Sequence, residues 1–449
     1  MLARRIPLSC LCLLLSLAPA VSAARVVARE RPSRQTKARA RAVIAEALAV
    51  AKRIGDEETR EDALLKIVSP LSLIDVDRAL ALARRSKVEE GWPQDEIIGI
   101  AEDLAKTNPD KAIAIADSMG WETLRASALS LVAQALAEVN PARSRRVAAK
   151  ILRLAHTIAD GDKRAQAVSS AAYAFARADP ATAVKLAKSI QDAGDLSHIV
   201  ELLAETDPRR ALGIAAGIRD NFYRAVALME VSRALSRTQP SRAHAVVERV
   251  LKEAPGIKDG DLREGILGQC ATELVKTGPT RAIRLARSIQ KADDRGSILC
   301  QLAVALAKRH PAQAKQLIEE ALGAARSITD GYYRDFAFSH IAYGLAATYP
   351  DKAFAVWRMI HSEPDRGMPL TAIFRQFAKR DLEGALAKAK RLENASDRTA
   401  ALLVIVEQLA WTGKDDRALK LARSITDDSS RVEALCDVAA AMLSRRDNR

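Results

Sequence analysis

An arginine recurs at one place in ten segments of this 449-residue chain, each time six residues after an apolar residue. Such a row could bind phosphate groups, but in six segments an aspartate lies four residues before the arginine. An aspartate ahead of a helical run is a typical N-cap, and the arginine then falls in the first helical turn. We predict structural turn pairs, in which the arginine reaches back or to the neighbouring repeat, and keep phosphate binding as the alternative. The pairs are Asp56 with Arg60, Asp160 with Arg164, Asp220 with Arg224, Asp259 with Arg263, Asp330 with Arg334 and Asp427 with Arg431.

The other potentially reactive residues form no pattern typical of an enzyme. The six histidines are spread over five segments without metal-ligand spacing, and no catalytic or nucleotide-binding motif occurs. Cys270, Cys300 and Cys436 each lie in an apolar helical pattern, which predicts buried thiols. Asp-Gly-Asp at 160–162 and 259–261 lacks the further ligands of a calcium loop and predicts helix caps. We expect no catalytic residue, metal or cofactor; an enzyme assembled from distant segments is the less favoured alternative.

Aromatic residues are concentrated in one part of the chain. Ten of the 17 lie between residues 332 and 377. Tyr332 and Tyr333 stand beside Arg334 at a predicted hairpin tip, and exposed aromatics of this kind suit a binding site. We hypothesise that residues 310–380 form a peptide-binding surface using Tyr332, Tyr333 and Trp357. The alternative is bulkier core packing, with the tyrosines covering a turn; the core positions predicted in this region are Phe336, Phe354 and Phe374.

These residues must be positioned by repeated helices. Units begin at 36, 75, 108, 140, 179, 207, 239, 278, 310, 349, 381 and 413, most of them 32 or 39 residues apart and one only 28. The seven additional residues of long units fall in the first half, and nearly two helical turns keep an apolar face in register. We therefore predict that each unit folds into a hairpin of two amphipathic helices. Gly213-x-x-x-Gly217, inside one unit, is predicted to ease helix packing.

Proline marks the junctions between units. Eight prolines occupy the same slot, and Asn or Asp precedes four of them. Asn or Asp followed by Pro is an N-cap and the first residue of a helix, where the missing N–H costs nothing. The predicted fold is all-α, a right-handed α-α superhelix (solenoid) of about twelve hairpins over residues 36–444. The eight prolines are Pro109, Pro141, Pro180, Pro208, Pro240, Pro279, Pro311 and Pro350.

The pattern resembles two α-solenoid families. The D-x-x-x-R-x-x-A turn, as in Asp160 to Ala167 and Asp330 to Ala337, is similar to the turn signature of HEAT repeats. The alanine spacing and the proline between units are similar to tetratricopeptide repeats. Both resemblances imply scaffolding or peptide recognition, usually on a concave face.

The chain ends have a different composition. Arg4, Arg5, an apolar run and small residues up to Ala23 predict a secretory signal peptide over 1–23, with an uncleaved anchor as the alternative. Residues 24–35 are predicted to be a basic flexible arm and 445–449 a disordered tail. Residues 24–41 contain seven basic residues and one acidic residue, a net charge of +6. Much of the overall charge of +14 therefore comes from the N-terminus, which argues against a specific nucleic-acid footprint.

Taken together, the sequence predicts an exported, periplasmic or extracellular, non-enzymatic scaffold without a transmembrane span after processing. Its partner would be a protein or peptide. The second hypothesis is contact of residues 24–41 with an anionic surface or polyanion.

Overall fold

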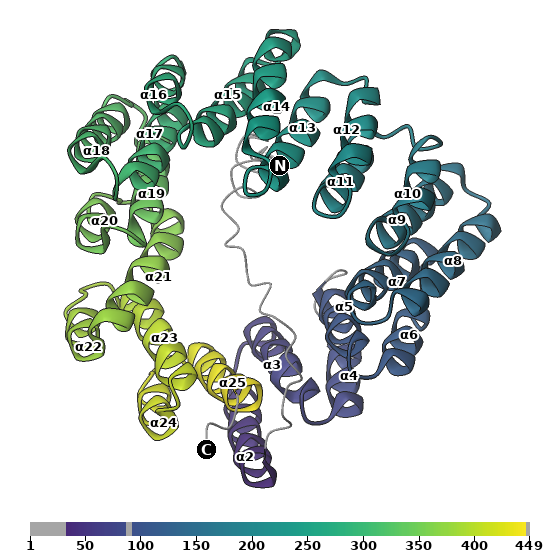
Figure 1. Ribbon diagram of the computed structural model, residues 1–449. Coiled ribbons are helices and arrows are strands. Elements are labelled where there is room, and N and C mark those ends of the chain that lie inside the picture. Colours follow the sequence, from purple (N-terminus) through teal and green to yellow (C-terminus); the bar gives the residue numbers. More distant parts are fainter. Residues whose placement is uncertain (1–32, 87–91, 446–449) are drawn as a thin grey trace. The chain divides into compact units, whose positions relative to one another are not determined.

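The computed structural model describes residues 33–86 and 92–445, so the predicted signal peptide, residues 24–32 and residues 446–449 lie outside it. The described residues form twenty-four α-helices and one short 3₁₀ helix, without a β-strand (Figure 1). The prediction of an all-α chain is confirmed. No helix in this part of the chain is long and apolar enough to cross a membrane.

The described residues divide into two compact units. The first spans residues 101–329, and the second combines residues 33–86 and 92–100 with residues 330–445. The first unit contains α6 (Pro109–Asp117), α7 (Glu122–Ala137), α8 (Pro141–Thr157), α9 (Gly161–Ala178), α10 (Pro180–Ala187), α11 (Ala193–Ala204), α12 (Pro208–Gly217), α13 (Asn221–Leu235), α14 (Pro240–Glu253), η1 (Ala254–Gly256), α15 (Gly260–Leu274), α16 (Pro279–Arg287), α17 (Ala292–Leu306) and α18 (Pro311–Arg326).

The second unit contains α2 (Arg34–Ala51), α3 (Glu57–Ser72), α4 (Val76–Arg85), most of α5 (Trp92–Ala105), α19 (Gly331–Ala346), α20 (Pro350–Trp357), α21 (Glu363–Arg380), α22 (Leu382–Lys390), α23 (Ala395–Trp411), α24 (Asp415–Arg423) and α25 (Asp428–Ser444). In both units helices alternate as the first and second members of hairpins.

All eight predicted prolines begin a helix, which confirms their assignment. Asn108, Asn140, Asp179 and Asp207 cap four of these helices by accepting a hydrogen bond from a first-turn N–H. The first helices of hairpins between residues 109 and 390 fall into two length classes: α8, α14 and α18 have 17, 14 and 16 residues, whereas α6 and α16 have nine. The additional residues of the long units therefore lengthen the first helix, as predicted.

In the first unit the second helices of hairpins form one row. Helices α7, α9, α11, α13, α15 and α17 contact one another in that order, and the even-numbered helices pack against this row. Buried alanines such as Ala126, Ala171 and Ala227 leave no side chain beyond the β-carbon, so neighbouring helices approach closely. Hairpins thus cover one another's apolar faces.

In the second unit the first hairpin packs on the last one. The row formed by α19, α21, α23 and α25 continues into α3, and α2 packs against α25. We call this contact between α2–α3 and α24–α25 the seam. Arg423 of α24 makes two bonds to the Glu46 carboxylate, at 2.8 and 2.7 Å, and Lys66 lies 2.9 Å from Glu433. Nothing in the repeat pattern had indicated that the first and last hairpins meet.

The seam reuses the contacts of an internal junction. The ion pair of Arg423 with Glu46 matches that of Arg287 on α16 with Glu320 on α18, whose two bonds measure 2.9 and 2.8 Å. The apolar face of α2 also recurs on α18, because each of its six buried residues has a buried counterpart 274 residues later. These residues are Ala40, Val43, Ile44, Ala47, Val50 and Ala51, matched by Ala314, Leu317, Ile318, Ala321, Ala324 and Ala325.

Two predictions about the chain ends need correction. Ser33 caps α2, so Arg34 and Gln35 are helical and are not part of a flexible arm. Arg39 forms an ion pair with Asp416 in the seam. At the other end, Arg445 pairs with both Asp415 oxygens, at 2.7 and 2.9 Å. The predicted tail therefore begins with a packed residue, because the arginine has a carboxylate within reach.

Candidate functional site

The aspartates of the predicted turn pairs are all N-caps. Each of the six accepts a hydrogen bond from a main-chain N–H of the following turn, at 2.7–3.2 Å. Bonds from Thr59, Lys163 and Ser430 hold the pKa of Asp56, Asp160 and Asp427, respectively, below the ordinary value. The Asp-Gly-Asp sequences are helix caps, as predicted. In the described part of the chain, no cluster of three or more His, Cys, Asp or Glu residues could hold a metal ion.

The arginines of the row bind main-chain carbonyl groups. Nine of the ten donate to the carbonyl oxygen six residues earlier, which lies just after the first helix; Arg295 to Ile289 is typical, at 2.7 Å. Arg224 also reaches Glu253, and Arg366 also reaches Asp397, in neighbouring repeats. Both predicted modes therefore occur. The nine arginines are Arg60, Arg125, Arg164, Arg224, Arg263, Arg295, Arg366, Arg398 and Arg431.

The three cysteines are buried, as predicted, and none of them forms a disulfide. Burial raises the pKa of Cys270 and Cys300 to about 12 and also raises the pKa of Cys436. A thiol with such a pKa holds its proton at neutral pH and is a poor nucleophile.

Two buried or partly buried acids that the sequence interpretation missed each stabilise the turn inside the next hairpin, between its first and second helices. The Asp335 carboxylate accepts hydrogen bonds from the N–H groups of His361 and Ser362, at 2.8 and 2.7 Å. Glu264 accepts equivalent bonds from the turn after α16. Each acid directly follows an arginine of the row, which is the signal that could have identified it.

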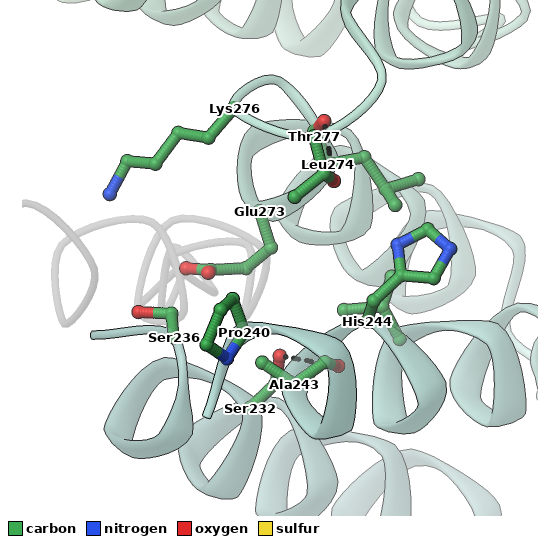
Figure 2. A pocket seen from close by; sticks show the side chains of 10 residues that line it. Ser232, Ser236, Pro240, Ala243, His244, Glu273, Leu274, Lys276 and Thr277 are labelled. Atoms are coloured by element: carbon green, nitrogen blue, oxygen red, sulfur yellow. Dashed lines mark hydrogen bonds between the residues drawn. The ribbon is translucent and has the colours of Figure 1, made fainter. Parts of the chain in front are cut away.

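A small cavity of about 80 Å³ between α13, α14 and α15 contains serine, histidine and glutamate side chains. Figure 2 shows the Glu273 carboxylate and the Ser236 hydroxyl on one side of the cavity and the His244 ring on the other. Ser236 donates to the carbonyl of Arg233, at 2.9 Å. Because this hydroxyl bonds within its own helix and faces away from the imidazole, it is not arranged as an activated nucleophile.

Four exposed aromatic residues share one place in the hairpin. Tyr332 and Tyr333 are 58% and 50% exposed in the first turn of α19, and their ring centres lie 5.4 Å apart, edge to face. Tyr223 occupies the first turn of α13, and Trp121 is the N-cap residue of α7, exposed to 58%. We call these four residues the aromatic tips. The prediction of exposed tyrosines is confirmed, whereas the sequence interpretation missed Trp121.

Trp357 is not part of this surface, and its prediction as a binding residue is wrong. It is only 2% exposed, stacks on Phe354 at 5.2 Å between ring centres, and donates its indole N–H to the carbonyl of Arg366. The Arg366 guanidinium lies 4.1 Å from the indole ring centre. Phe374 is fully buried nearby, as predicted, whereas Phe336 and Phe354 are half-buried. Tertiary packing thus places this indole in the core.

Comparisons with known proteins add little. No protein-family model and no curated protein matches the chain. Among solved structures, the chain is similar to the crystal structure of Ton1535 from Thermococcus onnurineus NA1, with 18% identity over 90% of this chain and 99% of that chain. The TM-score is 0.25, so this similarity supports no argument about fold or function.

Proposed function

We propose that this chain is an exported, non-enzymatic scaffold that binds a segment of a partner protein through the aromatic tips of the second unit, Tyr332 and Tyr333. Its architecture in this proposal is a right-handed α-solenoid of hairpins, similar to HEAT and tetratricopeptide repeats. The observation that supports binding is the repeated placement of exposed Trp and Tyr at the turn between the two helices of a hairpin. Such side chains supply a large contact area at low conformational cost.

The reactive groups give no comparable support to an enzyme. The aspartates and arginines most repeated in the sequence hold turns together, and the thiols are buried. The second hypothesis, contact of residues 24–41 with an anionic surface, loses part of its basis. Residues 34–41 belong to α2, and Arg39 is paired with Asp416.

Site-specific photo-crosslinking tests the binding proposal. A photo-reactive amino acid at position 332 or 333 should crosslink a partner protein in the native exported fraction. The same group at position 411 is the matched control, because Trp411 is also exposed, at 49%, but ends α23 and lies away from a tip. Equal crosslinking of the same partner from position 411 would contradict the proposal.

A double variant adds an affinity measurement. Tyr332→Ala with Tyr333→Ala should weaken binding of the identified partner by at least about tenfold, or 1.4 kcal/mol, whereas Trp411→Ala should leave it unchanged. Export is tested separately by N-terminal sequencing of the mature protein, which should begin at Ala24. A mature chain that retains residues 1–23 would contradict processing of the signal peptide.

A further inference from the structure

A groove of about 670 Å³ lies between α10 and α12 in the first unit. This volume falls within the range typical of ligand sites. Apolar side chains come from α10, α11, α12 and the turn after α10; they are Val184, Ala187, Ile190, Leu196 and Ile214. Val184 and Ile214 are only half-buried, so the groove has an accessible apolar surface.

The groove arises where the repeat is shortest. Pro180 and Pro208 are 28 residues apart, four fewer than the usual short spacing, and α11 has only 12 residues. Gly213 and Gly217 of α12 line the groove, and a β-carbon added to either would meet no atom within 4 Å. The prediction that these glycines ease helix packing is therefore wrong, because no atom packs closely against this side of them.

At the groove, a lysine and a glycine occupy two positions that form an ion pair at three other junctions. We number positions along the first helix of each hairpin, starting at the first residue of that helix. For α2 the count starts at Lys37, because Lys37 corresponds to Pro311, the first residue of α18, when the two apolar faces are aligned. Position 9 then pairs with position 10 of the next first helix at three junctions: Asp117 with Lys150, Arg287 with Glu320, and Arg423 with Glu46. At the α10–α12 junction the same count gives Lys188 and Gly217, which both line the groove. Glycine offers no carboxylate to the lysine.

Positive charge predominates around the groove. Lys188, Arg210 and Arg219 line it together with one acid, Asp220. Asp220 is already bonded to the Tyr223 N–H as the cap of α13, and Arg210 pairs with Asp207. The charges therefore favour a ligand that brings its own carboxylate to Lys188 and Arg219.

We propose that this groove binds a partner segment with apolar side chains next to Asp or Glu. The apolar side chains cover the surface left by the short repeat, and a carboxylate takes the place of the missing position-10 acid beside Lys188. A polypeptide fits better than a fatty acid, because the groove is open and exposes two glycines of α12 to an approaching main chain. This site is separate from the aromatic tips.

Three synthetic peptides test the proposal on the full mature protein. All three peptides have leucine at the same positions. At a second set of shared positions one peptide carries Glu, one carries Gln and one carries Lys. Fluorescence anisotropy should show the Glu peptide binding at least about tenfold more tightly than the Lys peptide, with weaker binding as salt is raised. Equal affinity for all three peptides, or no binding of the Glu peptide, would overturn the proposal.

Variants then locate the binding. Gly217→Glu supplies the missing acid and should weaken Glu-peptide binding by about tenfold or more. Gly323→Glu on α18 is the matched control, because Gly323 is also an exposed helical glycine with nothing within 4 Å of an added β-carbon. Lys188→Glu with Arg219→Glu should reverse the preference in favour of the Lys peptide. Equal effects of the two glycine variants, or an unchanged preference, would place binding elsewhere and overturn the assignment.

A competition experiment tests whether a fatty acid, rather than a peptide, occupies the groove. A medium-chain fatty acid should not displace the Glu peptide; complete displacement would identify a lipid site and overturn the peptide assignment. Failure here leaves the aromatic-tip proposal intact, because that proposal is tested at residues 332 and 333 with a different readout.

Discussion

The seam and the α10–α12 junction differ in a way that chain connectivity does not explain. The seam joins helices from opposite ends of the sequence, yet it has a buried apolar face and an ion pair matched at α16–α18. The α10–α12 junction lies within a continuous stretch of chain, yet it leaves a groove and has glycine at the ion-pair position. Side-chain identity and repeat length therefore determine how well a junction is filled, rather than covalent continuity.

The largest effect should come from truncating the apolar faces. Ile44→Ala in the seam and Ile318→Ala at its internal counterpart should each cost about 3 kcal/mol, because both side chains are buried and leave a cavity. Urea denaturation followed by circular dichroism measures both. Val139→Ala, at an exposed site, is the control. A cost below about 1 kcal/mol for Ile44→Ala alone would mean that the seam is not an ordinary junction.

The next effect concerns Asp294 and Asp397, two buried acids that each directly precede an arginine of the row. Burial, followed by the charge of Asp293, raises the pKa of Asp294 to about 7, whereas Asp397 accepts bonds from Arg366. For Asp294 the stabilising contribution of the protonated form is present below about pH 4 and is lost as the pH rises towards 7. Asp294→Asn should therefore raise stability at pH 8 by about 2 kcal/mol and change little at pH 4.

Asp397→Asn supplies the contrast, because it removes a charge-assisted bond and should lower stability at pH 8. Thermal melts of both variants at the two pH values measure the difference. A loss of stability from Asp294→Asn at pH 8 would show that this carboxylate has a partner when it is charged.

A smaller effect is expected from filling the irregular junction. Gly217→Glu should stabilise the chain by about 0.5–1 kcal/mol, since glutamate has the higher helix propensity and brings a carboxylate near Lys188. Gly323→Glu should give the gain in helix propensity alone, reduced by repulsion from Glu319 and Glu320 one turn earlier. Chemical denaturation of the two variants compares them, and a destabilising Gly217→Glu would contradict the matched position count.

The smallest effect should be that of the exposed ion pairs. A double-mutant cycle on Arg423 and Glu46 should give about 0.5 kcal/mol, and the cycle on Arg287 and Glu320 should agree with it. Hydrogen bonds from the arginines lower the pKa of Glu46 and Glu320, so the coupling should be present at neutral pH and be lost as the pH falls below the ordinary glutamate value. Coupling in only one cycle would distinguish the seam from the internal junction.

Much of the local structure could be predicted from the sequence, because it depends on residues close together in the chain. Pro109 begins α6, Asp160 caps α9 and Arg164 reaches the carbonyl of Ile158, all within one hairpin. The all-α fold follows from the same short-range patterns. These patterns do not specify which distant helices meet.

The errors and omissions concern tertiary contacts. Trp357 occupies a helix end that could have been exposed, but packing against Phe354 and Arg366 buries it. The seam joins residues 377 positions apart, and a repeat pattern contains no signal for such a contact. For the groove two signals were present, the spacing of 28 residues and the paired glycines, but neither indicates whether a neighbouring helix fills the space.

The seam also affects how unfolding should begin. Linear arrays usually need specialised capping repeats, and their terminal repeats lose structure first. Here the last and first hairpins shield each other, so the amide hydrogens of α2 and α25 should exchange together and about as slowly as those of internal helices. Limited proteolysis should for the same reason fail to shorten the described chain progressively from either end, and removal of α2–α3 should expose α25 to attack.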